Sequence, residues 1–246
     1  MERTFDFEAG ELLTFDKPYR WSSFDVVNKA RIAIKHFCGK KIKVGHAGTL
    51  DPLATGLVLI CTGKFTKKID SLQNEDKEYC GIITIGATRP SHDKETDIDK
   101  TFDYGYVTDD DVIKISQQFV GEQQQVPPAF SAIKIEGVRA YRFARMNDKE
   151  IDEKLKPRTI KIYDFEIQNI SLPEISFRIK CSKGTYIRSL VRDFGIQLGC
   201  GAYLEELRRT AVGNHRVEDA YDVLQFDEML DDMRMNQNTN TKTTDD

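Results

Sequence analysis

The segment Gly45-His46-Ala47-Gly48-Thr49-Leu50-Asp51-Pro52-Leu53-Ala54-Thr55-Gly56 carries the most information about this chain. Its glycines allow tight turns and a close approach of a ligand to the backbone, so the segment predicts a loop. Pro52 biases Asp51 away from helical backbone toward an extended conformation. A carboxylate held on such a loop, just before an apolar run, is well placed to act on a bound substrate. The alternative is that Asp51 only caps a turn, as Asp often does.

The residues around this loop predict regular elements. Residues 11–17 predict a short strand, and Ser22-Ser23-Phe24-Asp25 is a capping-box pattern that opens a helix ending near Gly39. The apolar residues of this helix recur at helical spacing and are Val27, Ala30, Ile34 and Phe37. After the loop, Leu57–Cys61 is fully apolar and suits a buried strand, and residues 63–72 predict a turn and another helix.

The second half of the chain mixes strands, helices and polar connections. Ile175, Phe177, Ile179 and Cys181 alternate with polar residues, which is typical of a half-buried strand. The other expected elements are a strand at 78–86, a long surface loop at 88–106, a helix start at 108–111, a helical turn at 141–146 and a helix at 187–198. No βα unit repeats, so we predict an α+β fold with a mixed, mostly antiparallel central sheet and flanking helices.

Composition and charge narrow the class of protein. The chain is 39% hydrophobic and 31% charged, as in soluble globular proteins. It has no apolar run long enough for a membrane helix and no signal-peptide pattern, so we expect a cytoplasmic protein. Five scattered cysteines without a CxxC pair indicate neither a zinc site nor a disulfide framework. The net charge of −4 hides a basic segment at 29–43 and an acidic one at 227–246. Residues 231–246 are polar, and we predict a disordered acidic tail.

The loop and several further segments resemble the TruB family of pseudouridine synthases. The loop matches the family motif GHTGTLDPLATG at eleven of twelve positions, with Ala47 in place of Thr. The other matching segments are DKPYRWSSFDVV (16–27), KEY (77–79), VPPAFSA (126–132), GTYIRSL (184–190) and LRRT (207–210). In the first of these, Arg20 stands where the family usually has Gly, so a positive φ at Arg20 would be strained.

The resemblance implies a pseudouridine synthase fold and an activity. A member of this family converts the T-loop uridine of tRNA (position 55) to pseudouridine after flipping the base out of its stack, without a metal or other cofactor. Asp51 would be the nucleophile. Arg188 would be its counter-ion, because a guanidinium lowers the pKa of an adjacent carboxylate. Tyr79 would stack on the target base and accept a proton near the sugar. The alternative for Arg188 is a solvated helix residue, and for Tyr79 an ordinary strand aromatic.

The resemblance and the charge pattern also imply residues that bind the substrate. His46 would lie against the RNA, Tyr186 and Leu207 would line the base pocket, and Lys17, Lys64 and Lys67 would contact phosphates. For each of them the alternative is a packed or solvated side chain. Residues 1–230 would form the catalytic domain, with an RNA-binding insertion near 124–152 that folds over the T arm. The segment after Gly213 is too short for a full PUA domain, and we expect a monomer with no protein partner.

Three competing functions remain at this point. A non-catalytic tRNA-binding protein on the same scaffold is disfavoured by the joint presence of Asp51, Tyr79 and Arg188. A related uridine isomerase that acts on ribosomal or small nuclear RNA through guide RNAs would have extra domains. An unrelated hydrolase that uses Asp51 would need a second acid, a Ser–His pair or a metal site, none of which the sequence indicates.

Overall fold

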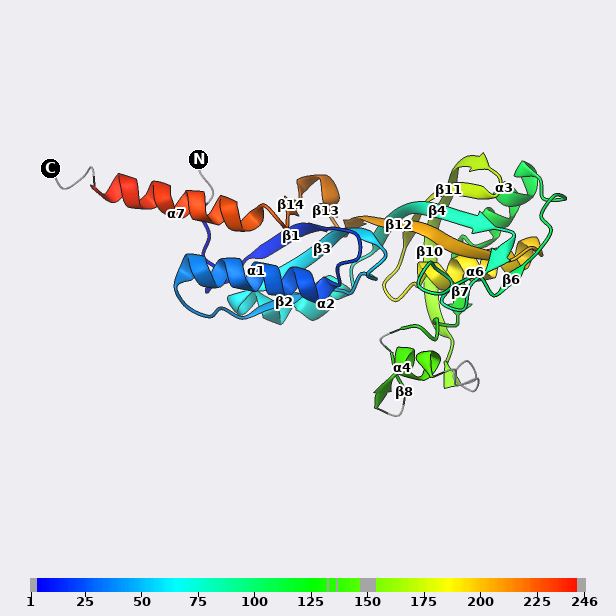
Figure 1. Ribbon diagram of the computed structural model, residues 1–246, viewed down its shortest axis with the longest axis horizontal. Coiled ribbons are helices and arrows are strands. Elements are labelled where there is room, and N and C mark those ends of the chain that lie inside the picture. Colours follow the sequence, from blue (N-terminus) through cyan, green and yellow to red (C-terminus); the bar gives the residue numbers. More distant parts are fainter. Residues whose placement is uncertain (1–3, 132, 136, 147–153, 243–246) are drawn as a thin grey trace. The chain divides into compact units, whose positions relative to one another are not determined.

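A computed structural model describes residues 4–131, 133–135, 137–146 and 154–242. The chain divides into two compact units, and each has its own strands and helices (Figure 1). Unit 1 comprises Met1–Glu75 and Arg208–Asp246, and unit 2 comprises Asp76–Leu207. Strand β12 (Ala202–Val212) contributes its first residues to unit 2 and its last residues to unit 1.

Unit 1 is built on a mixed sheet. Its strands are β1 (Leu12–Lys17), β2 (Val44–His46), β3 (Thr55–Thr62), β13 (His215–Arg216), β14 (Tyr221–Asp222) and the end of β12. β1 and β2 pair antiparallel to β3, whereas β14 runs parallel to β1, and β12 runs parallel to β3. Leu57–Cys61 in β3 are fully buried, which confirms the buried strand expected from their apolar sequence.

Among the described residues, the helices of unit 1 are α1 (Ser23–Cys38), η1 (Gly63–Lys68), α2 (Ile69–Gln73), η2 (Val217–Asp219) and α7 (Phe226–Lys242). The helix after Ser22 and the helical residues at 63–72 are those the sequence predicts, whereas η2 and α7 were not predicted. The capping box of α1 is confirmed, because the Asp25 N–H donates to Ser22 Oγ at 3.2 Å and the Ser22 N–H donates to Asp25 Oδ2 at 2.8 Å. Gly39 ends the helix in the left-handed conformation, with φ 66°.

The prediction of a disordered tail from residue 231 is wrong for residues 231–242, which continue α7. Leu230 is 1% exposed, and α7 lies alongside α1. Asp227 forms an ion pair with Lys29 at 3.3 Å, and the Arg234 guanidinium donates to the carbonyl of His36 at 3.2 Å. The segment is polar on average, and this average suggested disorder. A helix needs only a few apolar residues on one face in order to pack, and an average composition does not show them.

Unit 2 is built on an antiparallel sheet. Its strands follow one another in the order β12, β4 (Lys77–Ile85), β11 (Glu174–Cys181), β10 (Arg158–Ser171) and β7 (Gly121–Gln125). The pairs β4–β11, β11–β10 and β10–β7 are all antiparallel. The apolar residues of β11 are buried in alternation, as its sequence predicts. Together the two units confirm the predicted α+β class with a mixed, mostly antiparallel sheet.

Two helices, α3 (Asp109–Gln118) and α6 (Ile187–Leu198), pack with this sheet. The core between them is aromatic: the ring of Phe194 on α6 lies 5.9 Å from that of Phe165 on β10, and 6.2 Å from that of Phe119. The bounds of α6 are those the sequence predicts. The remaining elements of unit 2 among the described residues are β5 (Ala87–Thr88), β6 (Lys100–Thr101), β8 (Lys134–Ile135), β9 (Val138–Arg139) and α4 (Ala140–Arg145).

The segment near 124–152, which was predicted to be an RNA-binding insertion, holds β8, β9 and α4. Residues 132, 136 and 147–152 of it lie outside the described residues, and its binding to RNA stays a prediction. Ala140 and Leu155 are buried there and pack with Phe143 in a small core of their own. In the described part of the chain, no helix is both long enough and apolar enough to cross a membrane.

Candidate active-site residues

The loop that carries Asp51 is fixed by hydrogen bonds within unit 1. The Ser23 hydroxyl accepts from the Leu50 N–H at 2.8 Å and donates to the Leu50 carbonyl at 3.2 Å. The Ala54 N–H donates to the carbonyl of Asp51 at 3.1 Å, which closes a tight turn. Asp51 itself is partly exposed. The loop is therefore a defined support for a carboxylate that solvent reaches.

A buried arginine outside the predicted site residues supports the same loop. Arg209 is 1% exposed, and its guanidinium donates to the carbonyls of Leu57, Thr49 and Gly48 at 2.7, 3.2 and 3.5 Å. The planar fork of a guanidinium carries five N–H donors, so it suits several acceptors at once. The adjacent pair Arg208-Arg209 in a strand was the available signal, because alternate residues of a strand face opposite sides.

Lys17 is not an exposed phosphate contact, which corrects the expectation from the sequence. Its side chain is fully buried, and Nζ donates to the carbonyls of Pro18, Trp21 and Pro52 at 3.1, 2.6 and 3.3 Å. Burial lowers the pKa of Lys17 to about 8, although the negative charge of Asp51 acts in the opposite direction. The ammonium therefore ties the end of β1 to the residue that follows Asp51.

The other predicted contacts of unit 1 are more accessible. His46 lies half-buried on β2, where burial lowers the pKa of its ring, with a smaller opposing effect from the backbone of Gly48. The ring is therefore neutral at pH 7. Lys64 and Lys67 are exposed on η1, so their positions are compatible with phosphate contacts, which stay a prediction.

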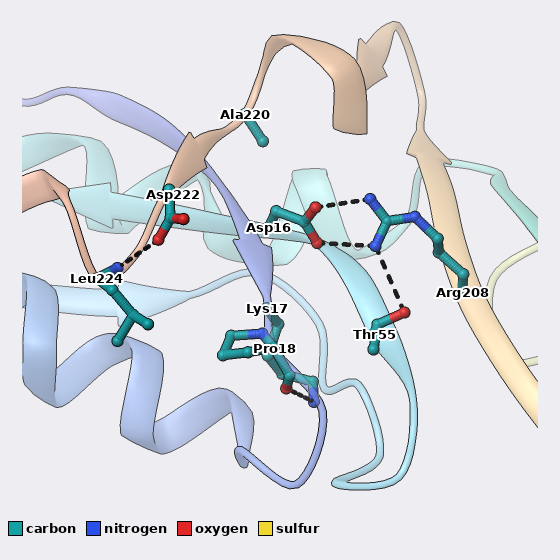
Figure 2. Close-up of a pocket in the computed structure, with 8 residues that line it drawn as sticks. All are labelled: Asp16, Lys17, Pro18, Thr55, Arg208, Ala220, Asp222 and Leu224. Carbon is teal, nitrogen blue, oxygen red and sulfur yellow. Dashed lines mark hydrogen bonds and ion pairs between the residues drawn. The ribbon is translucent and has the colours of Figure 1, made fainter.

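A pocket of about 310 Å³ opens in unit 1 at the end of β1. Figure 2 shows Arg208 reaching from β12 to Asp16 on β1. The guanidinium donates to both carboxylate oxygens, at 3.0 and 2.6 Å, and to Thr55 Oγ1 at 3.4 Å. The pocket is lined by Asp16, Lys17, Pro18, Thr55, Arg208, Ala220, Asp222 and Leu224. Asp16, which directly precedes Lys17, thus has a bidentate partner within unit 1.

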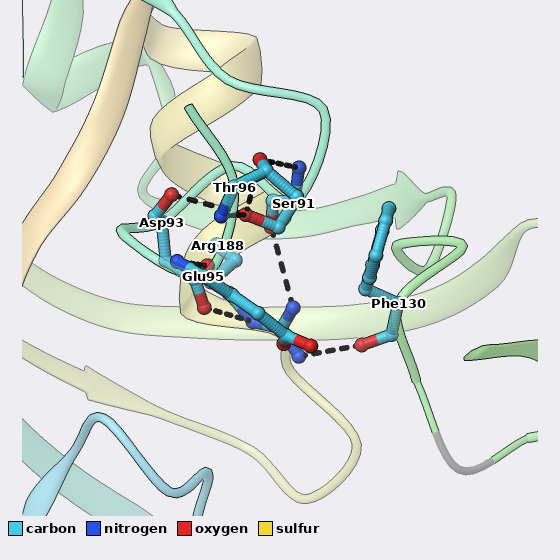
Figure 3. Close-up of polar contacts among 6 residues, drawn as sticks. All are labelled: Ser91, Asp93, Glu95, Thr96, Phe130 and Arg188. Atoms are coloured by element: carbon cyan, nitrogen blue, oxygen red, sulfur yellow. Dashed lines mark hydrogen bonds and ion pairs between the residues drawn. The ribbon is translucent and has the colours of Figure 1, made fainter. Parts of the chain in front are cut away.

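Arg188 is buried near the start of α6 in unit 2 and is 4% exposed, which excludes a solvated helix residue. Its guanidinium donates to the carbonyls of Phe130 and Ser91 at 2.9 and 3.3 Å. The Nε atom lies 3.5 Å from Asp93 Oδ2 (Figure 3). Within unit 2, the charge of Arg188 is therefore balanced by Asp93, a residue that the sequence analysis did not select.

The segment around Asp93 was expected to be a surface loop, but Ser91 and Asp93 are 0% and 6% exposed. The loop satisfies its own polar groups, as buried loops must. The Ser91 and Thr96 hydroxyls lie 2.9 Å apart, the Thr96 N–H donates to Ser91 Oγ at 3.2 Å, and the Ser91 N–H donates to Thr96 Oγ1 at 3.1 Å. The Glu95 N–H donates to Asp93 Oδ1 at 2.9 Å. These short polar side chains were the signal in the sequence.

The other predicted residues of unit 2 lie on β4, directly before α6, and on β12. Tyr79 is on β4, opposite Ile179 of β11, and is 8% exposed. Tyr186 precedes α6, and the buried amide of Gln125 holds its backbone: the Tyr186 N–H donates to Gln125 Oε1 at 2.8 Å, and Gln125 Nε2 donates to the Tyr186 carbonyl at 3.1 Å. Leu207 is half-buried on β12. Their contacts with a substrate stay predictions.

The predicted site residues thus belong to two groups. Asp51, His46, Lys17, Lys64 and Lys67 are in unit 1, whereas Tyr79, Arg188, Tyr186 and Leu207 are in unit 2. Among the described residues, no cluster of three or more His, Cys, Asp or Glu side chains could hold a metal ion.

Comparison with protein-family models gives two matches that together span most of the chain. Residues 35–187 match the N-terminal domain of TruB family pseudouridylate synthase, and residues 188–245 match the tRNA pseudouridylate synthase B C-terminal domain. The chain is 51% identical to tRNA pseudouridine synthase B of Flavobacterium johnsoniae over 227 residues, which is 92% of this chain and 98% of that protein. It is equally similar to the protein of the same name from Phocaeicola vulgatus, covering 92% and 95% of the two chains.

Among solved structures, the fold is similar to a chain of the archaeal box H/ACA sRNP Nop10–Cbf5 complex, with a TM-score of 0.64 and 26% identity. A chain of a Cbf5–Nop10–Gar1 complex gives a TM-score of 0.65 and 28% identity. The matches cover 91% and 90% of this chain but 54% of each solved chain. This chain therefore spans about half the length of those solved chains.

Proposed function

Because the chain belongs to the TruB family of pseudouridylate synthases, we propose that it converts the T-loop uridine of tRNA (position 55) to pseudouridine. The chain is an RNA uridine-to-pseudouridine isomerase. The tRNA assignment is carried by the 51% identity, over nearly the full length of both chains, to a protein named tRNA pseudouridine synthase B. The T-loop position rests on the resemblance of residues 45–56 to the family motif. A monomer that acts on tRNA in the cytoplasm is part of the same proposal.

The reaction needs no net oxidation or reduction. The base is detached from the ribose at a ring nitrogen, turned, and rejoined through a ring carbon. The carbon loses one proton and the nitrogen gains one, so the atoms balance without a co-reactant. A base in the folded T loop is stacked, and flipping it out costs a few kcal/mol, which contacts with the RNA must offset.

Asp51 is the proposed nucleophile, acting as an ionised carboxylate on the ribose or the base, or stabilising a charged ribose intermediate. This role is supported within unit 1 because the loop carrying Asp51 is held in place. Ser23 and Arg209 form hydrogen bonds with the backbone of this loop. A carboxylate that is already oriented loses little entropy when it meets the substrate, and this lowers the barrier.

Arg188 and Tyr79 are the proposed catalytic residues of unit 2. Arg188 would stabilise the charge of Asp51, and its own orientation is set by Asp93. Arg188→Lys tests this role, because lysine keeps the charge and loses the planar fork. Tyr79 would stack on the target base and accept a proton near the sugar. Tyr79→Phe keeps the ring and removes the hydroxyl, which separates the two roles.

The remaining predicted contacts complete the proposal for binding. His46 would lie against the RNA as a neutral ring, and Tyr186 and Leu207 would line the pocket for the flipped base. Lys64 and Lys67 would pair with phosphates, which predicts that tRNA affinity falls steeply with salt. The segment 124–152 would fold over the T arm. Lys17 is not retained as a phosphate contact, because its ammonium is buried.

The deciding experiment incubates the purified protein with an unmodified tRNA transcript and maps pseudouridine along it. A single product site in the T loop is expected, and Asp51→Asn should lose the product while still binding tRNA. Wild-type protein that binds tRNA without forming pseudouridine, under conditions where a relative is active, would instead favour a non-catalytic tRNA-binding protein.

A further inference from the structure

A turn in unit 1 holds an arginine in a conformation that favours glycine. The Trp21 N–H donates to the carbonyl of Pro18 at 3.4 Å, which closes a four-residue turn with Arg20 at its third position. The φ of Arg20 is 66°. A positive φ at this position is the mark of a type II turn, where glycine is preferred because a Cβ atom is strained. The strain that the sequence would predict for a positive φ at Arg20 is therefore present in the fold.

The turn cannot relax, because its surroundings fix it. The Arg20 N–H donates to the carbonyl of Pro52 at 2.8 Å. The buried ammonium of Lys17 binds the carbonyls of Pro18, Trp21 and Pro52. These bonds attach the turn to the residue that follows Asp51. None of these bonds uses the side chain of Arg20, so a glycine at position 20 would keep every one of them without the strain.

The side chain of Arg20 makes few contacts within the protein that would offset the strain of its backbone. Arg20 is exposed, and its guanidinium carbon lies 5.6 Å from the ring centre of Tyr19, which is itself 46% exposed. Stacking on an exposed ring is weak. Across the described residues, no carboxylate lies within ion-pair distance of Arg20. The two acids nearest to it in sequence have other partners: Asp16 pairs with Arg208, and Asp25 forms the capping box with Ser22.

Arg31, in the same unit, is an arginine whose side chain does form hydrogen bonds within the protein. It also stacks on an exposed ring, that of Phe24, at 5.9 Å. Its guanidinium, however, donates to Asn28 Oδ1 at 2.8 Å and to the carbonyl of Val44 at 3.3 Å. Arg20 has the ring and the charge, but not such acceptors among the described residues. The N–H donors of Arg20 are therefore available to an acceptor outside the protein.

We propose that Arg20, held over Tyr19, contacts the RNA substrate by pairing with a backbone phosphate close to the uridine on which Asp51 acts. This inference rests on the proposed action on RNA. A guanidinium binds a phosphate through two parallel N–H···O bonds, and a phosphate contact does not require a particular base. The strained turn keeps this cation at the edge of the loop that carries Asp51, and binding of the substrate offsets the strain.

The test compares Arg20→Gly, Arg20→Asn and Arg20→Lys with wild type in the full chain. Gly and Asn tolerate the left-handed conformation and remove the charge, whereas Lys keeps the charge. Lys35→Gln is the matched control, since Lys35 is an exposed cation on α1, about 20 Å along the helix axis from the cap. The readouts are thermal melting, tRNA affinity as a function of salt, and kcat and KM for pseudouridine formation.

For Arg20→Gly and Arg20→Asn, we expect melting temperatures equal to or above that of wild type. Their Kd and KM for tRNA should rise about fivefold to tenfold, with kcat unchanged. The slope of log affinity against log salt should become shallower by about 0.7 to 0.9, the value for one lost phosphate contact. Arg20→Lys should retain most of the wild-type slope, and Lys35→Gln should leave Kd unchanged within about twofold.

Two outcomes would overturn the inference. If Arg20→Gly melts lower and its affinity is unchanged, the side chain is structural. If Lys35→Gln weakens binding as much as Arg20→Gly does, only the total charge matters. Wild type that binds the transcript without forming pseudouridine would refute the proposed reaction, but the salt slope would still decide the role of Arg20. Wild type that does not bind RNA at all would refute both.

Discussion

Two loops of this protein each present a carboxylate beside a buried arginine, but they use the arginine differently. In unit 1, Arg209 donates to the backbone carbonyls of the loop that carries Asp51. In unit 2, Arg188 pairs with the carboxylate of Asp93 itself. The first arginine stiffens a support for an acid that solvent reaches, whereas the second balances the charge of an acid that is buried. In unit 1 the acid is the proposed catalytic residue and the arginine supports its loop, whereas in unit 2 the arginine is the proposed catalytic residue and the acid balances its charge.

The largest expected difference between the loops appears when each carboxylate is neutralised. Asp51→Asn should lower kcat at least about a thousandfold, because an amide is no nucleophile. Its melting temperature should stay within about 2 °C of wild type, because the loop is held through its backbone. Single-turnover assays and thermal melting measure the two effects. A large loss of stability would mean that Asp51 is as structural as Asp93, and the contrast between the loops would disappear.

Asp93→Asn should instead destabilise the fold. It removes the negative charge that lies 3.5 Å from the buried guanidinium of Arg188, and breaking a buried ion pair typically costs about 3–5 kcal/mol of unfolding free energy. For a chain of this size that corresponds to a melting temperature lower by roughly 10 °C. Asp97→Asn is the control, since Asp97 is an exposed acid of the same loop and should change stability by less than about 0.5 kcal/mol. Equal melting of the two variants would contradict a buried ion pair.

The buried ammonium of Lys17 should make the free energy of unfolding depend on pH. Its pKa is about 8 in the folded protein against an ordinary value of 10.5, so between these values the unfolded chain binds more protons than the folded one. Stability therefore rises with pH across this window. The difference in unfolding free energy between wild type and Lys17→Met should grow in favour of wild type from pH 8 to pH 10.5, by up to about 3 kcal/mol. Urea unfolding measures it, and parallel pH curves for the two proteins would show that Lys17 is not buried as described.

The smallest expected effect comes from the hydroxyl pair that closes the Asp93 loop. Thr96→Val keeps the shape of the side chain and removes its hydrogen bonds with Ser91, so it should cost about 1–2 kcal/mol of unfolding free energy. Thr96→Ser restores the hydroxyl and should recover most of that loss. Urea unfolding of both variants checks this, and a serine variant as unstable as the valine one would mean that the methyl group of Thr96 matters rather than its hydroxyl.

Local rules were enough to predict several elements from the sequence. The capping box at Ser22 and Asp25 fixed the start of α1, because it satisfies backbone N–H groups within one turn. The alternation in residues 175–181 fixed β11, because successive side chains of a strand face opposite sides. The glycines and the proline around Asp51 fixed the loop between β2 and β3. Each of these depends on neighbours in the chain, so the sequence alone determined them.

Only the tertiary structure decided which charges are buried and what balances them. Lys17 looks like an exposed cation until three carbonyls converge on its ammonium, one of them from Pro52. Asp93 looks like part of a polar surface loop until Arg188 meets it from a distant helix. The acidic end of the chain looks disordered until α7 lies along α1. In each case the deciding contact joins residues far apart in sequence, and the free energy of burying a charge or an apolar face depends on that contact rather than on local composition.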